Sequence, residues 1–355
     1  MKALILAGGV GTRLRPLSHA MPKQLVPIAN KPVVYHGLEN IRRAGITEVG
    51  MVVGDRGDQI RAEVGDGSRL GLRITYIPQS EPLGLAHCVL ISRDFLGDDD
   101  FVMYLGDNVL LGEISDFLED FREHRPAAQV VVTKVADPTA CGIAEVDADG
   151  RVLGLEEKPR HPKSDLALMG VYLFSPAVHE AVQSIGRSRR DEWEITDAIQ
   201  WLVERGERVR AQQFSGFWRD TGQIEDLLEC NRVLLDGLTG DRKGDVDALS
   251  RLSGQVVVEH GAKVRRSRIE GPVIIAEGTV IEDSVIGPHT AFGPDCAVYD
   301  AGVRNSIVLA GTTVRGVHGI HDSVIGRSST IVPSPGEPRR HRLIVGDHTY
   351  AELAT

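Results

Sequence analysis

The stretch Leu4–Leu25, LILAGGVGTRLRPLSHAMPKQL, joins a short apolar run to a turn with three glycines and then to the cations Arg13 and Lys23. A strand followed by such a turn places backbone N–H groups where they can approach a phosphate. The stretch lacks the Gly-Lys-Ser/Thr of a P-loop, and Gly9–Leu14 lacks the third glycine of a dinucleotide fingerprint. We predict a turn that approaches a triphosphate, with Arg13 forming paired hydrogen bonds to it and Lys23 adding a compact positive charge. A plain glycine turn with solvated cations is the alternative.

Length and composition narrow the class of protein. The chain has 355 residues and is 42% hydrophobic, enough for a sizeable core and two domains. Its formal net charge is −10 and it carries no basic stripe, so we expect no nucleic-acid partner. No run approaches the ~18 apolar residues of a membrane helix, and the apolar start is too short for a signal peptide. The four cysteines lie far apart, as free thiols do in a reducing compartment. We therefore expect a cytoplasmic protein with no membrane partner.

Strand and helix signals alternate in the first part of the chain. Alternation of this kind favours an α/β fold with a mostly parallel sheet and helices on both sides. Ligands of such folds bind at the carboxyl ends of the strands. The expected strands are residues 2–7, 48–54, 73–78, 101–107 and 128–135, and the expected helices are 32–45, 113–124 and 223–238.

The pattern changes after the helix expected at 223–238. From residue 253 onward, single aliphatic residues recur every five or six positions, with glycine and small residues between them. A hexapeptide period predicts a β-helix with about three repeats per coil. Ordinary strands with coincidental spacing are the alternative, and the tail 335–355 indicates at most one last strand. We predict a domain over 1–240, a linker over 241–252 and a β-helix with a tail over 253–355.

Several motifs carry a family resemblance. GGVGTRLRP at 8–16 is followed by PKQLVP at 22–27, and LGDN, EEKP, EITD and WRDTG then follow in order at 105–108, 156–159, 194–197 and 218–222. Over residues 1–235 the chain resembles the sugar-1-phosphate nucleotidyltransferases, and among them the long-form glucose-1-phosphate thymidylyltransferases. The resemblance implies a Rossmann-like nucleotidyltransferase domain followed by a left-handed β-helix, and a homo-oligomer.

The same resemblance implies the reaction. Such enzymes join dTTP and glucose 1-phosphate to give dTDP-glucose and pyrophosphate by direct in-line attack, with Mg²⁺ as cofactor. A phosphate monoester is already an anion near pH 7, so the attack needs no general base. The barrier is the repulsion and alignment of two anions, and cations with good positioning lower it. Arg13 and Lys23 are accordingly the predicted catalytic residues.

Two aspartates are the predicted metal ligands. Asp107 and Asp220 each follow a short apolar segment, and hard carboxylates from distant segments can hold one Mg²⁺ between two phosphates. The resemblance assigns the metal to this pair. An aspartate in a Gly-Asp-Asn turn is otherwise a common turn former.

The remaining predicted contacts fall into two groups. Gln79 can donate and accept at the imide edge that thymine and uracil share, and Glu157 can accept hydrogen bonds from sugar hydroxyls. The predicted nucleotide-binding residues are Leu6, Gly8, Gly9, Gly11, Thr12, Gln24, Gln79, Gly84 and Asp107. The predicted sugar-phosphate-binding residues are Asn108, Gly142, Glu157, Lys158, Arg190 and Trp218.

Some alternatives stay open at this point. Arg190 lies in a basic run typical of a solvated surface, and Trp218 is equally compatible with a core position. The chain also departs from the family at Cys141, where an aromatic residue is frequent, so the shape of the sugar pocket stays open.

The function has alternatives as well. UTP or another sugar 1-phosphate could serve, because one methyl group separates thymine from uracil. A hexapeptide acyltransferase using His289 or His321, and an inactive regulatory subunit, are less favoured. We expect the β-helix to serve assembly or regulation, so that a chain ending near Leu249 keeps measurable transfer.

Overall fold

Contacts between residues divide the chain into two units, which we describe separately. The computed structural model describes residues 1–334 and 341–354. The first unit is Met1–Val10 with Val34–Asp220, and the second is Gly11–Val33 with Thr221–Thr355. The glycine-rich segment Gly11–Val33 therefore groups with the C-terminal strands. The boundary expected at 241–252 remains a prediction.

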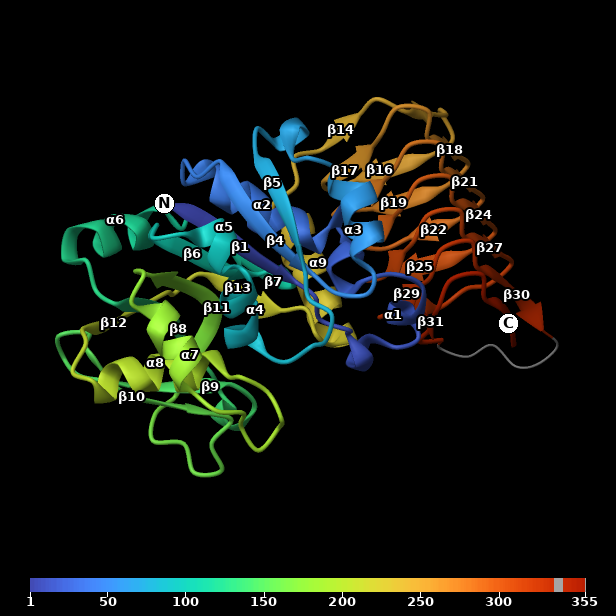
Figure 1. Ribbon diagram of the computed structural model, residues 1–355. Coiled ribbons are helices and arrows are strands. Elements are labelled where there is room, and N and C mark those ends of the chain that lie inside the picture. The colour runs from blue at the N-terminus through green and yellow to red at the C-terminus, as the bar shows by residue number, and fades with distance from the viewer. Residues whose placement is uncertain (335–340, 355) are drawn as a thin grey trace. The chain divides into compact units, whose positions relative to one another are not determined.

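A mixed sheet forms the frame of the first unit (Figure 1). Its central strands run in the order β11-β6-β1-β4-β5; β1 pairs in parallel with both β4 and β6, while β11 runs antiparallel to β6. The expected α/β class and the parallel core strands are confirmed. The strands of this unit are β1 (Lys2–Ala7), β4 (Glu48–Val53), β5 (Arg73–Pro78), β6 (Phe101–Leu105), β7 (Asn108–Leu111), β8 (Ala128–Lys134), β9 (Gly142–Val146), β10 (Val152–Glu157), β11 (Leu166–Phe174), β12 (Val209–Gln213) and β13 (Phe217–Asp220).

Helices cover both faces of this sheet. Leu4 and Met103 point to one face, where they join a buried cluster with Val89 and Ile199. Successive side chains of a strand point to opposite faces, so Tyr104 lies on the other face, where its ring meets Gly37 of α2. The helices are α2 (Val33–Arg43), α3 (Gly57–Val64), α4 (Leu85–Ile91), α5 (Arg93–Leu96), α6 (Ser115–His124), α7 (Val178–Ser184) and α8 (Ile195–Glu204), with 3-10 turns η3 (Ser68–Leu70) and η4 (Pro138–Ala140).

Three parallel sheets form the frame of the second unit, and Figure 1 shows their strands stacked in successive coils. The first holds β14 (Asp241–Arg242), β17 (Val256–Val258), β20 (Val273–Ile275), β23 (Thr290–Phe292), β26 (Ile307–Val308), β29 (Val324–Ile325) and β31 (Ile344–Val345). The second holds β15 (Asp245–Val246), β18 (Lys263–Arg265), β21 (Val280–Glu282), β24 (Ala297–Tyr299), β27 (Thr313–Arg315), β30 (Thr330–Ser334) and β32 (Tyr350–Ala354). The third holds β16 (Arg251–Ser253), β19 (Arg268–Glu270), β22 (Val285–Ile286), β25 (Gly302–Arg304) and β28 (Ile320–His321). This stack is consistent with the expected left-handed β-helix. Part of the tail, residues 335–340 and 355, lies outside the described residues.

The coil repeat explains the hexapeptide pattern. Val258 pairs with Ile275, which pairs with Phe292, so each coil advances by about the same length of chain. All three side chains are fully buried in the apolar interior of the stack. One inward aliphatic residue per face gives the spacing of five or six residues that the sequence shows.

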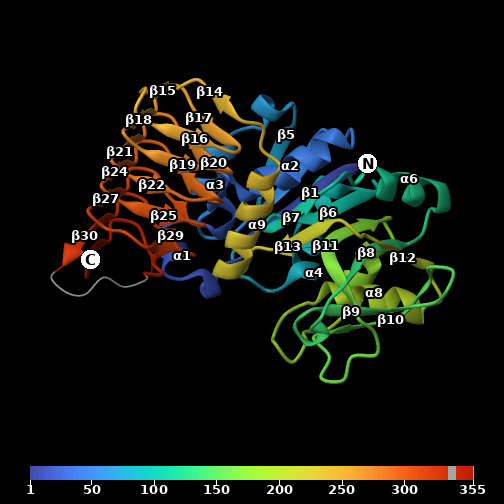
Figure 2. The same cartoon turned by 180° about the vertical axis from the view of Figure 1, so that it is seen from behind.

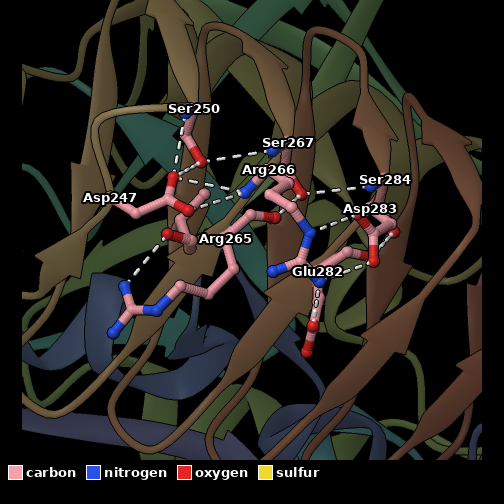
Figure 3. Close-up of polar contacts among 9 residues, drawn as sticks. Asp247, Ser250, Arg265, Arg266, Ser267, Glu282, Asp283 and Ser284 are labelled. Atoms are coloured by element: carbon pink, nitrogen blue, oxygen red, sulfur yellow. Dashed lines mark hydrogen bonds and ion pairs between the residues drawn. The ribbon is translucent and has the colours of Figure 1, made fainter.

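Serine hydroxyls link successive coils (Figure 3). Ser250 Oγ accepts from Ser267 N at 3.1 Å, and Ser267 Oγ accepts from Ser284 N at 3.0 Å. Ser284 Oγ in turn accepts from Ala301 N at 3.1 Å and donates to Glu282 O at 2.7 Å. These hydroxyls satisfy backbone N–H groups at a corner where strand pairing is interrupted.

The second unit also contains α9 (Ile224–Asp236), α1 (Leu17–Ala20), the 3-10 turns η1 (Thr12–Leu14) and η2 (Lys23–Leu25), and the short hairpin β2 (Pro27–Ile28) and β3 (Lys31–Pro32). Figure 2 shows α9 beside the β-helix. Leu235 of α9 packs in a buried cluster with Ile274 and Ala291. In the part of the chain that the structure describes, no helix combines the length and apolar character needed to cross a membrane.

Candidate active site

The carboxyl ends of the parallel strands meet at one edge of the sheet in the first unit. β1, β4 and β6 are aligned in parallel, so the residues that follow them lie together. Gly106 N donates to Leu6 O at 2.9 Å, and a Cβ at Gly54 would lie 2.8 Å from Gly8 O. Leu6, Gly8 and Asp107 are therefore at the edge where α/β folds bind ligands. Gly9 follows as an exposed residue.

The predicted metal ligands lie at neighbouring positions of one strand ladder. β13 pairs antiparallel with β7, and Asp220 stands opposite Asn108. Asp107 directly precedes Asn108 and is 8% exposed. Strand pairing thus places Asp107 next to the residue opposite Asp220, although the two segments are more than a hundred residues apart in sequence.

A hydrogen-bond chain orients Asp107. Trp218 Nε1 donates to Asn108 Oδ1 at 2.7 Å, and Asn108 Nδ2 donates to Asp107 Oδ1 at 3.2 Å. The indole is partly buried, so its position is compatible both with a ligand contact and with a place in the core, the two alternatives that the sequence left open. Its N–H finds an acceptor, as buried indoles usually do. Contact of Asn108 and Trp218 with a sugar phosphate stays a prediction.

A second cluster surrounds Glu157 at the end of β10. Arg190 Nη1 donates to Glu157 Oε1 at 3.1 Å, and Lys158 Nζ lies 3.8 Å from the same oxygen. Thr196 Oγ1 donates to Glu157 Oε2 at 3.4 Å, and a Cβ at Gly142 would lie 3.0 Å from that atom. The structure brings Gly142, Glu157, Lys158 and Arg190 together, and their contact with a sugar phosphate stays a prediction.

The electrostatics of this cluster are unusual. Burial raises the pKa of Glu157, and the nearby Glu194 carboxylate raises it further, while Lys158 and Arg190 act against the rise. Lys158 has a φ of +46°, a conformation that non-glycine residues rarely adopt. Such backbone strain is often concentrated at functional sites. Two cations beside a half-buried carboxylate can bind a phosphate and a sugar hydroxyl side by side.

The side chain of Gln79, which the sequence predicts to contact the base, is held in a defined orientation after β5. Gln79 is 7% exposed, and its Nε2 lies 3.0 Å from His87 Nδ1. Burial, and then Arg187, lower the pKa of His87, so the ring is neutral near pH 7 and Nδ1 accepts from the amide. This assignment places Gln79 Oε1 toward Gly8, where a Cβ would lie 2.9 Å from it.

The backbone packing around Gly84 requires a glycine at this position. Its φ is +103°, and a Cβ there would lie 2.4 Å from Trp193 O. This close approach allows Trp193 N to donate to Leu83 O at 2.8 Å and Ala86 N to donate to Trp193 O at 3.0 Å. Contact of Gly84 with a nucleotide stays a prediction.

The sequence reasoning missed His87 and Trp193. Their rings stack with centroids 5.5 Å apart, and the Arg187 guanidinium lies 4.6 Å from the Trp193 ring centroid. Trp193 directly precedes the EITD motif, but nothing in the sequence spacing of the two residues indicates that they meet.

The remaining predicted residues belong to the second unit. Gly11 has a φ of +69°, and a Cβ there would lie 3.1 Å from Lys23 Cβ. Ser18 Oγ donates to Gly11 O at 2.6 Å and closes the turn that carries Thr12 and Arg13. The structure therefore brings the glycine turn and the stem of Lys23 together.

Gln24 is an unusual buried polar residue in this segment. It is 1% exposed, and its Oε1 has no hydrogen-bond partner among residues 1–334 and 341–354. An unsatisfied buried amide costs free energy, so it calls for an explanation such as a ligand or a water molecule. Its predicted contact with the ribose or base stays a prediction.

The fold defines a class of protein, the α/β folds with parallel core strands and a ligand-binding edge at the carboxyl ends of those strands. The nucleotidyl transferase family model matches residues 2–237, and the chain belongs to that family. A glucose-1-phosphate thymidylyltransferase from Streptomyces griseus is 56% identical over 355 residues, which is all of both chains. The low-salt glycan biosynthesis nucleotidyltransferase Agl11 of Haloferax volcanii is 41% identical and covers 99% of this chain and 100% of its own.

A solved structure supports the same conclusion. A Bacillus anthracis crystal structure, described as a glucose-1-phosphate thymidylyltransferase in complex with sucrose, matches with a TM-score of 0.63 and 33% identity. The match covers 68% of this chain and 98% of that one. The resemblance to the sugar-1-phosphate nucleotidyltransferases, which the sequence motifs indicated, is therefore confirmed.

Proposed function

We propose that this chain transfers a thymidylyl group from dTTP to glucose 1-phosphate, giving dTDP-glucose and pyrophosphate. The observation that carries the proposal is the placement of Asp107 beside the partner position of Asp220 on one ladder. The full-length similarity to the Streptomyces griseus thymidylyltransferase supports the choice of substrates.

The donor set suits magnesium. Carboxylate oxygens are hard ligands, and Mg²⁺ is commonly held by one or two carboxylates together with substrate phosphates and waters. Among the residues that the structure describes, no group of three or more His, Cys, Asp or Glu side chains could hold a metal by itself. A bound Mg²⁺ would neutralise charge on the phosphate oxygens. Asp107 and Asp220 would hold it, and the Trp218–Asn108 chain would fix the Asp107 carboxylate.

The sugar phosphate would bind at the Glu157 cluster. Lys158 and Arg190 supply positive charge for the phosphate, and Glu157 accepts hydrogen bonds from sugar hydroxyls. Arg13 and Lys23 are assigned to the triphosphate, where negative charge moves onto the leaving pyrophosphate. No general base is required, because the attacking phosphate oxygen is already an anion.

The base preference rests on Gln79. With Nε2 engaged by His87, Gln79 presents Oε1 as an acceptor, which suits the N3–H of thymine or uracil. UTP is therefore the second candidate substrate, and we expect dTTP to be preferred by about tenfold, the scale that one methyl group supports.

Pyrophosphate release tests the proposal directly. We expect release with dTTP, glucose 1-phosphate and Mg²⁺, weaker release with UTP, and little with ATP or GTP. Chelation of the metal should stop the reaction and added Mg²⁺ should restore it. A purine nucleotide that gives the highest kcat/KM would overturn the base assignment, and acetyl transfer by the intact protein would support the acyltransferase alternative.

A further inference from the structure

A tight hairpin follows the segment that carries Lys23. β2 and β3 pair through Pro27–Pro32 and Ile28–Lys31, and the turn between them consists of Ala29 and Asn30. Both turn residues have positive φ, 45° and 63°. Two positive φ values are typical of the two-residue turns that suit the twist of a hairpin. Asparagine tolerates this conformation well, whereas alanine does so at a cost.

The tip of this hairpin is hydrogen-bonded to both α9 and the β-helix. Ala29 N donates to Asn231 Oδ1 at 2.9 Å. Asn30 Nδ2 donates to Phe292 O at 2.8 Å, on strand β23 of the β-helix. The two bonds come from adjacent residues and go to two different elements, so together they hold the tip of the hairpin in place.

Asn231 uses both ends of its amide. It is fully buried on α9, and its Nδ2 donates to His289 O at 3.0 Å while its Oδ1 accepts from Ala29. Apolar contacts surround this link, since Ala29 packs against the buried cluster of Leu235 and Ala291. A buried amide that is hydrogen-bonded at both its oxygen and its nitrogen favours one arrangement, because other arrangements leave these polar atoms unpaired.

Little chain separates the hairpin from Lys23. Val33 N donates to Val26 O at 3.2 Å, which closes the base of the hairpin, and Val26 N in turn donates to Lys23 O at 3.2 Å. Val26 and Ile28 are fully buried. The stem of Lys23 packs against Gly11 on its other side. A displacement of the hairpin tip would therefore move the Lys23 backbone.

We propose that Asn30 and Asn231 are positioning residues, through which the β-helix sets the place of Lys23. The catalytic consequence rests on the proposed function, in which Lys23 acts on the triphosphate. The β-helix then contributes to the rate of transfer without contributing a side chain to the chemistry.

The experiment compares two matched asparagines. Asn30→Gly keeps the positive φ of the turn and removes only the hydrogen bond to Phe292 O. The control is Asn305→Gly in the β-helix, because Asn305 also has a positive φ, 44°, and its Nδ2 donates to Asp322 Oδ1 at 2.7 Å. Among the described residues, Asn305 hydrogen-bonds to Pro288 and Asp322, neither of which belongs to the hairpin, and its replacement carries the same entropy cost of a glycine.

We expect Asn30→Gly to lower kcat by about three- to tenfold, the range that one lost hydrogen bond supports, and to leave the KM for glucose 1-phosphate near that of the wild type. Asn305→Gly should stay within about twofold of the wild type in kcat. In a Lys23→Ala background, adding Asn30→Gly should have no further effect, because a residue that acts only through Lys23 is not additive with its loss. Equal kcat losses in both glycine variants, an unchanged kcat in Asn30→Gly, or a fully additive double variant would overturn the proposal.

Amide hydrogen exchange separates this proposal from the proposed function. Asn30→Gly and Asn231→Leu should speed exchange over residues 23–33, and Asn305→Gly should not. We call the hydrogen bonds of Ala29, Asn30 and Asn231 the tether. Faster exchange in these variants, together with a wild-type protein that releases no pyrophosphate, would mean that the tether exists and the proposed function is wrong. Unchanged exchange in both variants would overturn the tether itself, whatever the activity.

Discussion

At the scale of single residues, the paired aspartates give the sharpest prediction. We expect Asp220→Asn or Asp107→Asn to lower kcat by about a hundredfold or more, because each removes a charged oxygen ligand from a metal worth several kcal/mol to the transition state. Steady-state kinetics at saturating Mg²⁺ measure the loss. Asp98→Asn, at an aspartate whose side chain is 85% exposed, is the control and should behave as the wild type. Near-normal turnover in either active-site variant would contradict the shared metal site.

Glu157 combines its proposed role in sugar binding with a cost in stability. Because its pKa is raised, the folded protein binds more protons than the unfolded chain between the ordinary value of 4.5 and the raised one. The free energy of unfolding therefore falls as the pH rises through that window. We expect Glu157→Gln to raise the KM for glucose 1-phosphate by about tenfold or more, while its melting temperature gains on the wild type between pH 5 and pH 8.

Glu192→Gln is the matched control for this result. Glu192 also pairs with Arg190, but it is more exposed. Its substitution should move neither the KM nor the pH dependence of the melting temperature. If the melting temperatures of Glu157→Gln and the wild type changed with pH in parallel, the raised pKa of Glu157 could not be the cause of the pH dependence.

From the contact of His87 with Gln79 we predict that nucleotide binding depends on pH. Its lowered pKa means that its contribution to stability is present above the ordinary value of 6.5 and is lost as the pH falls through the folded-state pKa. Protonated Nδ1 can no longer accept from Gln79, so the amide must turn and present a different edge. We expect the KM for dTTP to rise between pH 7.5 and pH 5.5 in the wild type.

His87→Asn supplies the comparison, because its side-chain oxygen accepts a hydrogen bond but does not titrate. Titration of the triphosphate itself affects both proteins equally, so the difference between the two profiles isolates His87. Identical profiles would mean that the ring does not orient Gln79.

How far the site follows from the sequence differs from residue to residue. The motifs of the family resemblance pointed to Asp107, Asp220 and Glu157, although only Asp107 lies at the end of a strand that the sequence itself predicts. The sequence could not give the Trp218–Asn108 bond, since it depends on β13 pairing with β7 across more than a hundred residues. Nor could it give the Gln79–His87 contact, which depends on side-chain orientation within one loop.

At the scale of elements, the coils of the β-helix are linked by a serine ladder, in which the hydroxyls of Ser250, Ser267 and Ser284 each accept a hydrogen bond from a backbone N–H group. Ser284→Ala leaves Ala301 N, in a fully buried residue, without its acceptor. An unsatisfied buried donor costs about 1–3 kcal/mol, so the melting temperature should fall measurably. Ser184→Ala, where the hydroxyl bonds to Glu180 O on an exposed helix surface, should change it little. Equal shifts in the two variants would contradict the ladder's role.

The elements themselves were largely predictable. Residues 2–7, 73–78 and 101–105 form the strands that their apolar runs indicate, and the repeat after residue 253 forms stacked coils. Periodicity suffices there because each element buries one face. The hairpin at Pro27–Pro32 was not predicted, because its strands are two residues long and carry no alternation.

At the scale of the whole molecule, the tether changes the activity that we expect from a chain truncated before the β-helix. The motifs alone predict that a chain ending near Leu249 keeps measurable transfer. Such a chain lacks Phe292 O, Ile274 and Ala291, which hold the hairpin and cover Leu235. We expect measurable activity with kcat reduced by about tenfold or more and a KM for glucose 1-phosphate near that of the full chain. Circular dichroism checks that the shortened chain is folded, and full kcat in a folded truncation would contradict the expectation.

The hydrogen bond between Asn30 and Phe292 joins residues 262 positions apart in sequence. During synthesis the ribosome adds about 5–20 residues per second, so tens of seconds separate the emergence of the two partners. Until then the hairpin beside Lys23 has no acceptor on the β-helix, and the nascent chain carries its glycine-rich segment without that support. The coil that contains β23 thus acts as a timing element: a chain whose synthesis stops before Phe292 is left with an unsupported hairpin, and the support is present only in molecules that have been extended past that residue.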